Sequence, residues 1–198
     1  MMQISISVEP YLGLDISLLT QYIEKILEVK QSIPDLSIHF DYFKTNEPAL
    51  KLLKSYSDKI PIYTHLMNQE LNDDCFRVIS RDVTQVSDIT DDRQGLVFDL
   101  GCAVTGYEDL IRKCRHIIIM SVKCGQSGQT FNPEALTLVP QIRALNPQAV
   151  ITIDGGVNET NIKLVKNAGV DIAVVGNYAK KCYENGSLLA GINRLLRD

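Results

Sequence analysis

Ile151-Thr-Ile-Asp154-Gly155-Gly156-Val157-Asn158 is the stretch of this sequence that decides the fold. A β-branched run ends in an acid and two glycines, and a helical pattern with Asn158 as its N-cap then leads to Gly169. A second apolar run follows and ends at Gly176. Both runs are short and mostly apolar, which is typical of strands buried on both faces of a helix-covered parallel sheet. We therefore expect a βαβ unit here.

Glycines follow both strands of this unit. Gly155, Gly156 and Gly176 allow backbone N–H groups and helix N-termini to approach an anion closely, and phosphate is the usual anion in such places. Asp154 therefore lies beside a predicted phosphate site.

The composition limits the class of protein. The chain has 198 residues, 45% of them hydrophobic, and a net charge of −4, so we expect one domain over residues 1–198. The mild acidity gives no reason to expect nucleic acid or a membrane surface as a partner. Five cysteines without a CxxC spacing suit reduced thiols. No secretory leader or membrane span is recognisable, so we expect a cytoplasmic protein.

Strand and helix patterns alternate along the whole chain. Strands are predicted at residues 3–8, 36–41, 60–67, 75–79, 95–99, 116–122, 151–154 and 170–175, and helices at 15–30, 47–57, 107–113, 133–145, 158–168 and 188–196. Only seven residues, 68–74, separate the third and fourth strands, too few for a crossover helix. Residues 81–93 offer at best a short helix.

Eight strands in this order predict an α/β fold, a (β/α)8 TIM barrel shortened around its third and fourth βα units. A doubly wound open sheet is the alternative. The barrel is favoured because Ser7, His39, Asp41, His65 and Asp154 fall at the C-terminal ends of strands, where barrel enzymes build their sites.

Four of these side chains form a candidate site. His39 and Asp41 are two residues apart, so both project into the barrel if Ile38 and Phe40 face the helices. Buried polar groups need partners, and His65 and Asp154 can supply them. The set is either a buried hydrogen-bonded network or a metal site for Zn²⁺, Fe²⁺, Mn²⁺ or Co²⁺. The third histidine begins its strand and lies at the opposite end of a barrel.

Several motifs, in order, resemble those of the ribulose-phosphate 3-epimerase family of phosphate-binding TIM barrels. They are the Ser7 strand, His39-Phe-Asp41, His65-Leu-Met67, the run 119–133, and the segment from Ile153 to Gly176. The resemblance covers nearly the whole chain; it is strongest over residues 117–180 and weakest over 68–93.

The resemblance implies metal-dependent epimerisation at C3 of a ketose phosphate, D-ribulose 5-phosphate to D-xylulose 5-phosphate, through an enediolate. One divalent ion would be bound by His39, Asp41, His65 and Asp154, and the two aspartates would be the acid/base pair. It also implies assembly of several copies of this chain. The substrate-binding residues that it implies are Ser7, His65, Met67, Met120, Gly125, Gly128, Gly155, Gly156, Gly176 and Asn177.

Three segments depart from the family pattern. Lys123-Cys-Gly-Gln-Ser-Gly-Gln129 replaces Glu-Pro-Gly-Phe-Gly-Gly-Gln in the loop that forms the lid, Phe43-Lys44-Thr45 replaces Met-Asp-Gly, and Asn177 replaces serine. An epimerase for allulose 6-phosphate, or a sugar-phosphate-binding barrel without catalysis, therefore remain alternatives. The related decarboxylases and synthases are disfavoured, because their Asp-x-Lys-x-x-Asp spacing is absent after Asp41.

Overall fold

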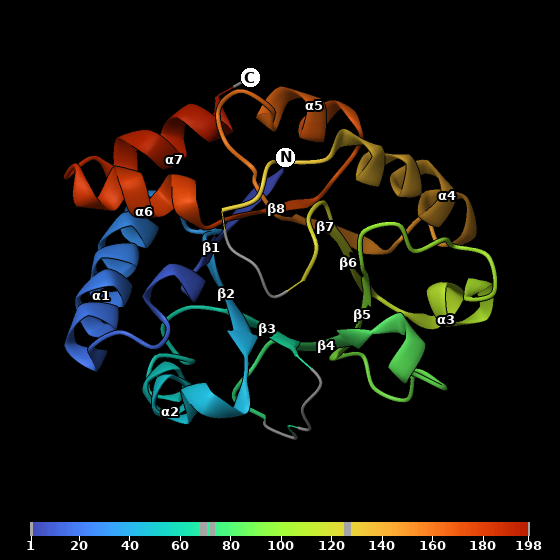
Figure 1. The fold of residues 1–198 in the computed structure, drawn as a ribbon, viewed down its shortest axis with the longest axis horizontal. Helices are drawn as coiled ribbons and strands as arrows, with labels where there is room; N and C mark the ends of the chain where they lie inside the picture. Colours follow the sequence, from blue (N-terminus) through green and yellow to red (C-terminus); the bar gives the residue numbers. More distant parts are fainter. Residues whose placement is uncertain (1, 68–70, 72–73, 125–127, 198) are drawn as a thin grey trace.

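The computed structural model describes residues 2–67, 71, 74–124 and 128–197, and eight parallel strands close into a barrel among them. Each strand pairs with its neighbours in chain order, and β8 pairs with β1 (Figure 1). The strands are β1 (Gln3–Ser7), β2 (Ser37–Tyr42), β3 (Ile62–Leu66), β4 (Val78–Asp82), β5 (Gln94–Phe98), β6 (His116–Met120), β7 (Val150–Asp154) and β8 (Ile172–Val175). The predicted TIM barrel is confirmed.

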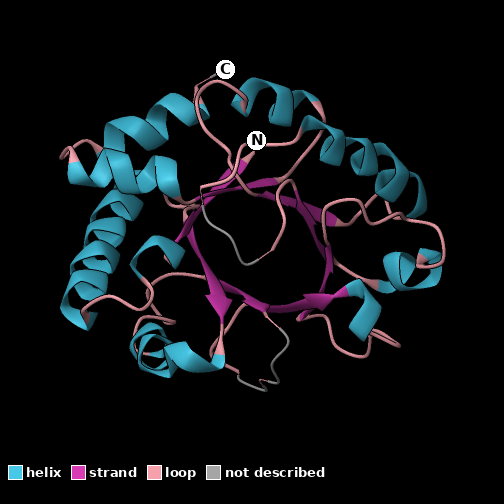
Figure 2. Cartoon of the chain, viewed as in Figure 1, coloured by secondary structure: helices cyan, strands magenta, loops and turns pink. Residues whose placement is uncertain are grey.

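Helices surround the strands (Figure 2). They are α1 (Ile16–Ser32), α2 (Glu47–Lys54), α3 (Glu108–Lys113), α4 (Leu138–Leu145), α5 (Ile162–Asn167), α6 (Asn177–Glu184) and α7 (Leu188–Leu196). α1 begins as predicted, because the Asp15 side chain accepts a hydrogen bond from the Ser17 N–H at 2.9 Å. None of the described helices is both long and apolar enough to span a membrane.

The predicted bounds of β4 and α5 are corrected by the structure. β4 spans Val78–Asp82 rather than 75–79, because its polar residues Arg81 and Asp82 continue the pairing with β5, opposite Leu96 and Val97. α5 begins at Ile162 with Asn161 as its N-cap, not Asn158. The Asn158 side chain accepts from the Thr160 N–H at 2.8 Å, which forms a local turn before the helix.

Two predicted helices are also corrected. Residues 133–145 are divided into a 3₁₀ turn, η4 (Pro133–Thr137), and α4, although proline stands at the first position as expected. The 3₁₀ turn η3 (Val83–Gln85) is the helical segment that the structure describes between β4 and β5. No helix occurs among the described residues between β3 and β4.

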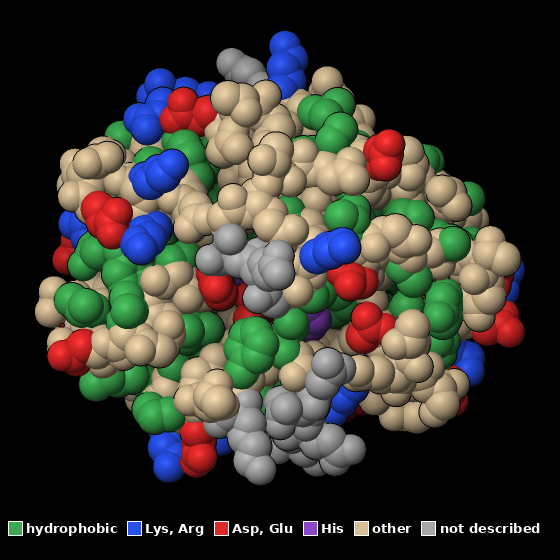
Figure 3. Space-filling view, in the orientation of Figure 1, with side chains coloured by type: hydrophobic (Ala, Val, Ile, Leu, Met, Phe, Trp, Pro, Cys, Tyr) green, Lys and Arg blue, Asp and Glu red, His purple; other side chains and the backbone are tan. Residues whose placement is uncertain are grey.

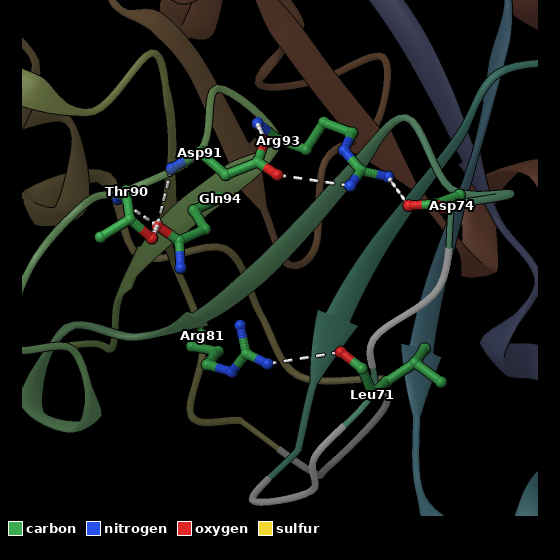
Figure 4. Close-up of polar contacts among 7 residues, drawn as sticks. All are labelled: Leu71, Asp74, Arg81, Thr90, Asp91, Arg93 and Gln94. Atoms are coloured by element: carbon green, nitrogen blue, oxygen red, sulfur yellow. Dashed lines mark hydrogen bonds and ion pairs between the residues drawn. The ribbon is translucent and has the colours of Figure 1, made fainter.

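Polar contacts hold this shortened side of the barrel together (Figure 4). The Arg93 guanidinium contacts Asp74 at 2.7 Å and Asp91 at 3.3 Å, and so joins the segment before β4 to the segment before β5. The Gln94 side-chain oxygen accepts from the Thr90 N–H at 2.7 Å. Exposed contacts of this kind stabilise weakly, so the barrel depends mainly on its buried apolar layer.

The main core lies between the strands and the helices. Ile38 and Phe40 of β2 are fully buried in it, as the alternation of β2 predicts. Their neighbours His39 and Asp41 are therefore left to the inside of the barrel. The fold thus places the His39 and Asp41 side chains in the barrel interior.

His116 begins β6 at the N-terminal end of the barrel, as predicted for the histidine outside the candidate site. Burial, together with the positive charges of Arg115 and Arg77, lowers its pKa from 6.5 to about 4, although Asp92 opposes the shift.

We predict that His116 makes the fold less stable in acid. Between pH 6.5 and about 4 the unfolded chain binds a proton at this imidazole that the folded chain does not, so stability falls as the pH falls through this window. Over this window the free energy of unfolding should fall by on the order of 1–3 kcal/mol. Urea unfolding of wild type and His116→Gln at pH 7.0, 5.5 and 4.5 tests this. A difference between the two proteins that is constant with pH would contradict it.

Candidate functional site

A cavity of about 350 Å³ opens at the C-terminal end of the barrel, where the candidate residues were expected. It is lined from β1, β2, β3, β6, β7 and β8 or the loops that follow them. Acidic side chains and a histidine are visible in the hollow at the centre of the face shown in Figure 3. The predicted residues that line it are Ser7, Asp41, His65, Met67, Met120, Gly128, Asp154, Gly155, Gly156, Gly176 and Asn177.

His39 lies at the base of this site, between two carboxylates. Its Nε2 atom is 3.4 Å from Asp41 Oδ1 and 3.3 Å from Asp154 Oδ2, so one imidazole connects β2 with β7. His65 Nδ1 is 3.2 Å from Asp41 Oδ1, because β2 and β3 pair with Asp41 opposite His65. The structure thus brings together all four residues expected to bind a metal.

The two imidazole nitrogens make no regular hydrogen bonds. Among the described residues, neither His39 Nε2 nor His65 Nδ1 has a partner of suitable geometry, although both side chains are buried. Unpaired buried nitrogens are costly, and they converge with a carboxylate oxygen so that ligand atoms of His39, Asp41 and His65 lie within 4.8 Å of one another. Two imidazoles and carboxylates suit a divalent transition metal, so the donor set fits such an ion.

The surroundings of the two aspartates shift their pKa values in opposite directions. Burial raises the pKa of Asp154, and the Asp41 carboxylate raises it further against the opposing charge of His39. Burial also acts on Asp41, but the positive charges of His39 and His65 outweigh it and hold the pKa of Asp41 well below its usual range. For His39, burial is outweighed by Asp154 and Asp41, which raise its pKa to about 9. Asp41 is therefore the carboxylate that is more readily ionised.

The glycine segments form a cradle beside these acids. Gly155 and Gly156 follow β7 with φ of 111° and 64°, conformations that other residues rarely adopt. Ser121 Oγ donates a hydrogen bond to the Asp154 carbonyl at 3.0 Å and fixes the start of the turn. Gly176 is the N-cap of α6, and Asn177 is the first residue of that helix. A helix N-terminus faces the cavity there.

Other predicted residues lie as follows. Ser7 ends β1, and its Oγ accepts a hydrogen bond from the Glu9 N–H at 3.2 Å. Met67 and Met120 line the cavity walls after β3 and at the end of β6. Gly125 lies outside the described residues.

Sequence reasoning missed one acidic residue of the cavity. Glu9 lines it from the 3₁₀ turn η1 (Glu9–Tyr11), directly after β1. Its place two residues beyond Ser7 was the available signal, since a strand end in a barrel faces the site. Burial, and then the carboxylates of Asp41 and Asp154, raise the pKa of Glu9, which indicates that the three acids share one region.

Comparison with known proteins identifies the family. The model of the ribulose-phosphate 3-epimerase family matches residues 74–179, which is more than half of the chain. The chain belongs to the ribulose-phosphate 3-epimerase family. The match includes β7, β8 and the glycine cradle, the segments on which the sequence resemblance was strongest.

Proteins named ribulose-phosphate 3-epimerase are similar to parts of the chain. The protein from Aquifex aeolicus is 36% identical over 89 residues, which cover 43% of this chain and 40% of that protein. The one from Mycobacterium leprae is 28% identical over 169 residues, or 74% of each chain. The matched region therefore spans less than half the length of the A. aeolicus protein.

Solved structures of low sequence identity share the fold. A mutant tryptophan synthase α-subunit from Pyrococcus furiosus superposes with a TM-score of 0.64 at 11% identity, covering 98% of this chain and 97% of that one. The 3-hexulose-6-phosphate synthase from Salmonella typhimurium gives 0.59 at 9% identity, with 98% and 96% covered. These likenesses show that this chain has the same barrel fold as these proteins.

We predict that a side chain at Gly156 destabilises the folded protein. A Cβ atom there would lie 2.6 Å from the Phe131 backbone nitrogen, in addition to the strain of a positive φ. Gly169 is the matched control, because it also has a positive φ, of 84°, but no atom within 4 Å of a Cβ. Gly156→Ala should lower the free energy of unfolding by about 1–3 kcal/mol more than Gly169→Ala does. Equal losses in urea unfolding would contradict the close packing described here.

Proposed function

We propose that this protein epimerises a ketose phosphate at C3, with D-ribulose 5-phosphate and D-xylulose 5-phosphate as the interconverted pair. The observation that carries the proposal is the pair of carboxylates, Asp41 and Asp154, each about 3.3–3.4 Å from the same buried imidazole nitrogen. They project from β2 and β7, so a substrate carbon above His39 would have one carboxylate on each side. Membership of the epimerase family supports the same reaction.

Two carboxylates are what this reaction needs. Inverting the carbon beside a ketone requires removal of the C3 proton from one face and delivery of a proton to the other. Asp41, whose pKa is lowered, is suited to be ionised and to take a proton; Asp154, whose pKa is raised, is suited to hold one. In the reverse direction the two exchange roles. The enediolate between the steps loses its C3 configuration because that carbon becomes planar.

A divalent metal ion fits the same residues. His39, His65, Asp41 and Asp154 would hold it, and its candidates are Zn²⁺, Fe²⁺, Mn²⁺ and Co²⁺. When bound, the ion would polarise the ketone and so acidify the C3 proton. The chain's own part is to keep both imidazoles buried and aimed at one point, and to leave each carboxylate partly open to the cavity.

The glycine cradle would bind the phosphate of the substrate. Backbone N–H groups near Gly128, Gly155, Gly156 and Gly176, together with Asn177 at the start of α6, are the groups that we assign to it. Phosphate there would place the reacting carbons toward His39, and Ser7, Met67 and Met120 would surround the carbon chain. Phe43 lines the cavity and belongs to a segment that departs from the family pattern, so allulose 6-phosphate is the alternative substrate.

Loss of either aspartate should stop epimerisation. We expect Asp41→Asn and Asp154→Asn each to lower kcat for D-ribulose 5-phosphate by about 10²–10⁴-fold, because the remaining carboxylate reaches one face only. One of the two variants should still exchange the C3 hydrogen in D₂O without forming D-xylulose 5-phosphate, since a single base can return the proton to its own face. NMR follows both processes in one sample.

Asp82→Asn is the matched control. Asp82 ends β4 at the same end of the barrel but lies outside the candidate metal set. We expect its turnover to stay within a few-fold of wild type. Near wild-type turnover in Asp41→Asn or Asp154→Asn would remove that residue from the mechanism. Metal-loaded wild type that neither exchanges nor epimerises ribulose or allulose phosphates would instead support a sugar-phosphate-binding barrel without catalysis.

A further inference from the structure

We propose that the Glu9 carboxylate binds the substrate hydroxyl on the carbon between the reacting centre and the phosphate, and that it thereby selects the configuration at C4. The inference rests on the proposed function and extends it, because it assigns the recognition of that carbon to a residue outside the metal set and the phosphate cradle.

The turn that carries Glu9 is firmly held. The Glu9 backbone N–H donates a hydrogen bond to Ser7 Oγ at 3.2 Å. The next residue, Pro10, packs near Gly176, with its Cγ atom 3.8 Å from where a Cβ on that glycine would lie. Tyr11, the last residue of η1, is buried with its ring centroid 4.5 Å from that of Tyr22. A side chain on an anchored turn can present its functional group at a defined position, as specific recognition requires.

The barrel order places Glu9 between the two halves of the site. β1 pairs with β8 on one side and with β2 on the other. β8 leads to Gly176 and the phosphate cradle, whereas β2 carries His39 and Asp41. Glu9 follows β1 directly and lines the same cavity. A substrate with its phosphate in the cradle and C3 between the aspartates would therefore have its C4 hydroxyl nearest to this turn.

The Glu9 carboxylate is suited to bind a hydrogen-bond donor that carries no negative charge. Among the described residues its carboxylate has no hydrogen-bond or ion-pair partner, although it is partly buried and near Asp41 and Asp154. Lys180 exerts an attractive charge, but its ammonium lies 3.9 Å from Glu184 and over the Tyr11 ring. An ionised carboxylate only accepts hydrogen bonds. It would repel the phosphate group and attract a hydroxyl, which a ketose phosphate offers at C4.

The test uses two substrates that differ only at C4, D-xylulose 5-phosphate and L-ribulose 5-phosphate. The kcat/KM of C3 hydrogen exchange in D₂O is measured for each with metal-loaded wild type, Glu9→Gln and Glu9→Leu. We expect wild type to prefer D-xylulose 5-phosphate, and Glu9→Leu to lower kcat/KM for that sugar at least tenfold while reducing the preference by a similar factor. Glu9→Gln keeps an acceptor oxygen and should retain part of the preference.

Glu134→Gln, which changes an exposed glutamate at η4, controls for the loss of one negative charge and should leave both values unchanged. If Glu9→Leu slows both sugars equally, Glu9 acts only through the charge of the site, and the inference is wrong. It is also wrong if Glu9→Leu is indistinguishable from wild type. Wild type that exchanges the C3 hydrogen of neither sugar, nor of D-ribulose 5-phosphate, would show that the proposed function itself has failed.

Discussion

A buried imidazole held between two carboxylates is the interaction on which the candidate site depends. His39 is almost completely inaccessible to solvent and connects β2 with β7 through Asp41 and Asp154. Charged groups removed from water must be neutralised by one another or by an ion. Among the described residues, His39 Nε2 and His65 Nδ1 have no hydrogen-bond partner of suitable geometry. The contacts between the imidazoles and the carboxylates therefore satisfy these buried groups only in part. A divalent cation would satisfy them all at once.

The barrel is the scaffold that makes this arrangement possible. Parallel strands end on one face, so side chains far apart in the sequence converge there, and the same closure brings β8 and its glycine cradle beside β1. The candidate metal ligands lie on β2, β3 and β7, and the glycine cradle and the Glu9 turn lie between them around the same mouth. The shortened part of the ring lies between β3 and β5, whereas β7 and β8 lie across the ring from it (Figure 1).

The sequence predicted the barrel and the four-residue cluster because both follow from short-range periodicity. Alternation in β2 determines which face His39 and Asp41 occupy, and the burial of Ile38 and Phe40 confirms it. Boundaries that depend on local polar contacts could not be predicted. Asn158 and Asn161 both suit an N-cap, and only the turn with Thr160 distinguishes them. Glu9 was missed because an acid beside a proline is typical of an exposed turn, although its position just after the end of β1 was a signal that it faces the cavity.

We propose that these buried groups form a metal site rather than a self-sufficient hydrogen-bonded network. Anomalous diffraction from crystals grown with Mn²⁺ or Zn²⁺, recorded on both sides of the metal's absorption edge, tests it most directly. We predict one peak per chain at about 2.0–2.2 Å from His39 Nε2 and His65 Nδ1, with Asp41 and Asp154 as further ligands. A map without a peak there, in which the imidazoles instead donate regular hydrogen bonds to the two carboxylates, would contradict the account.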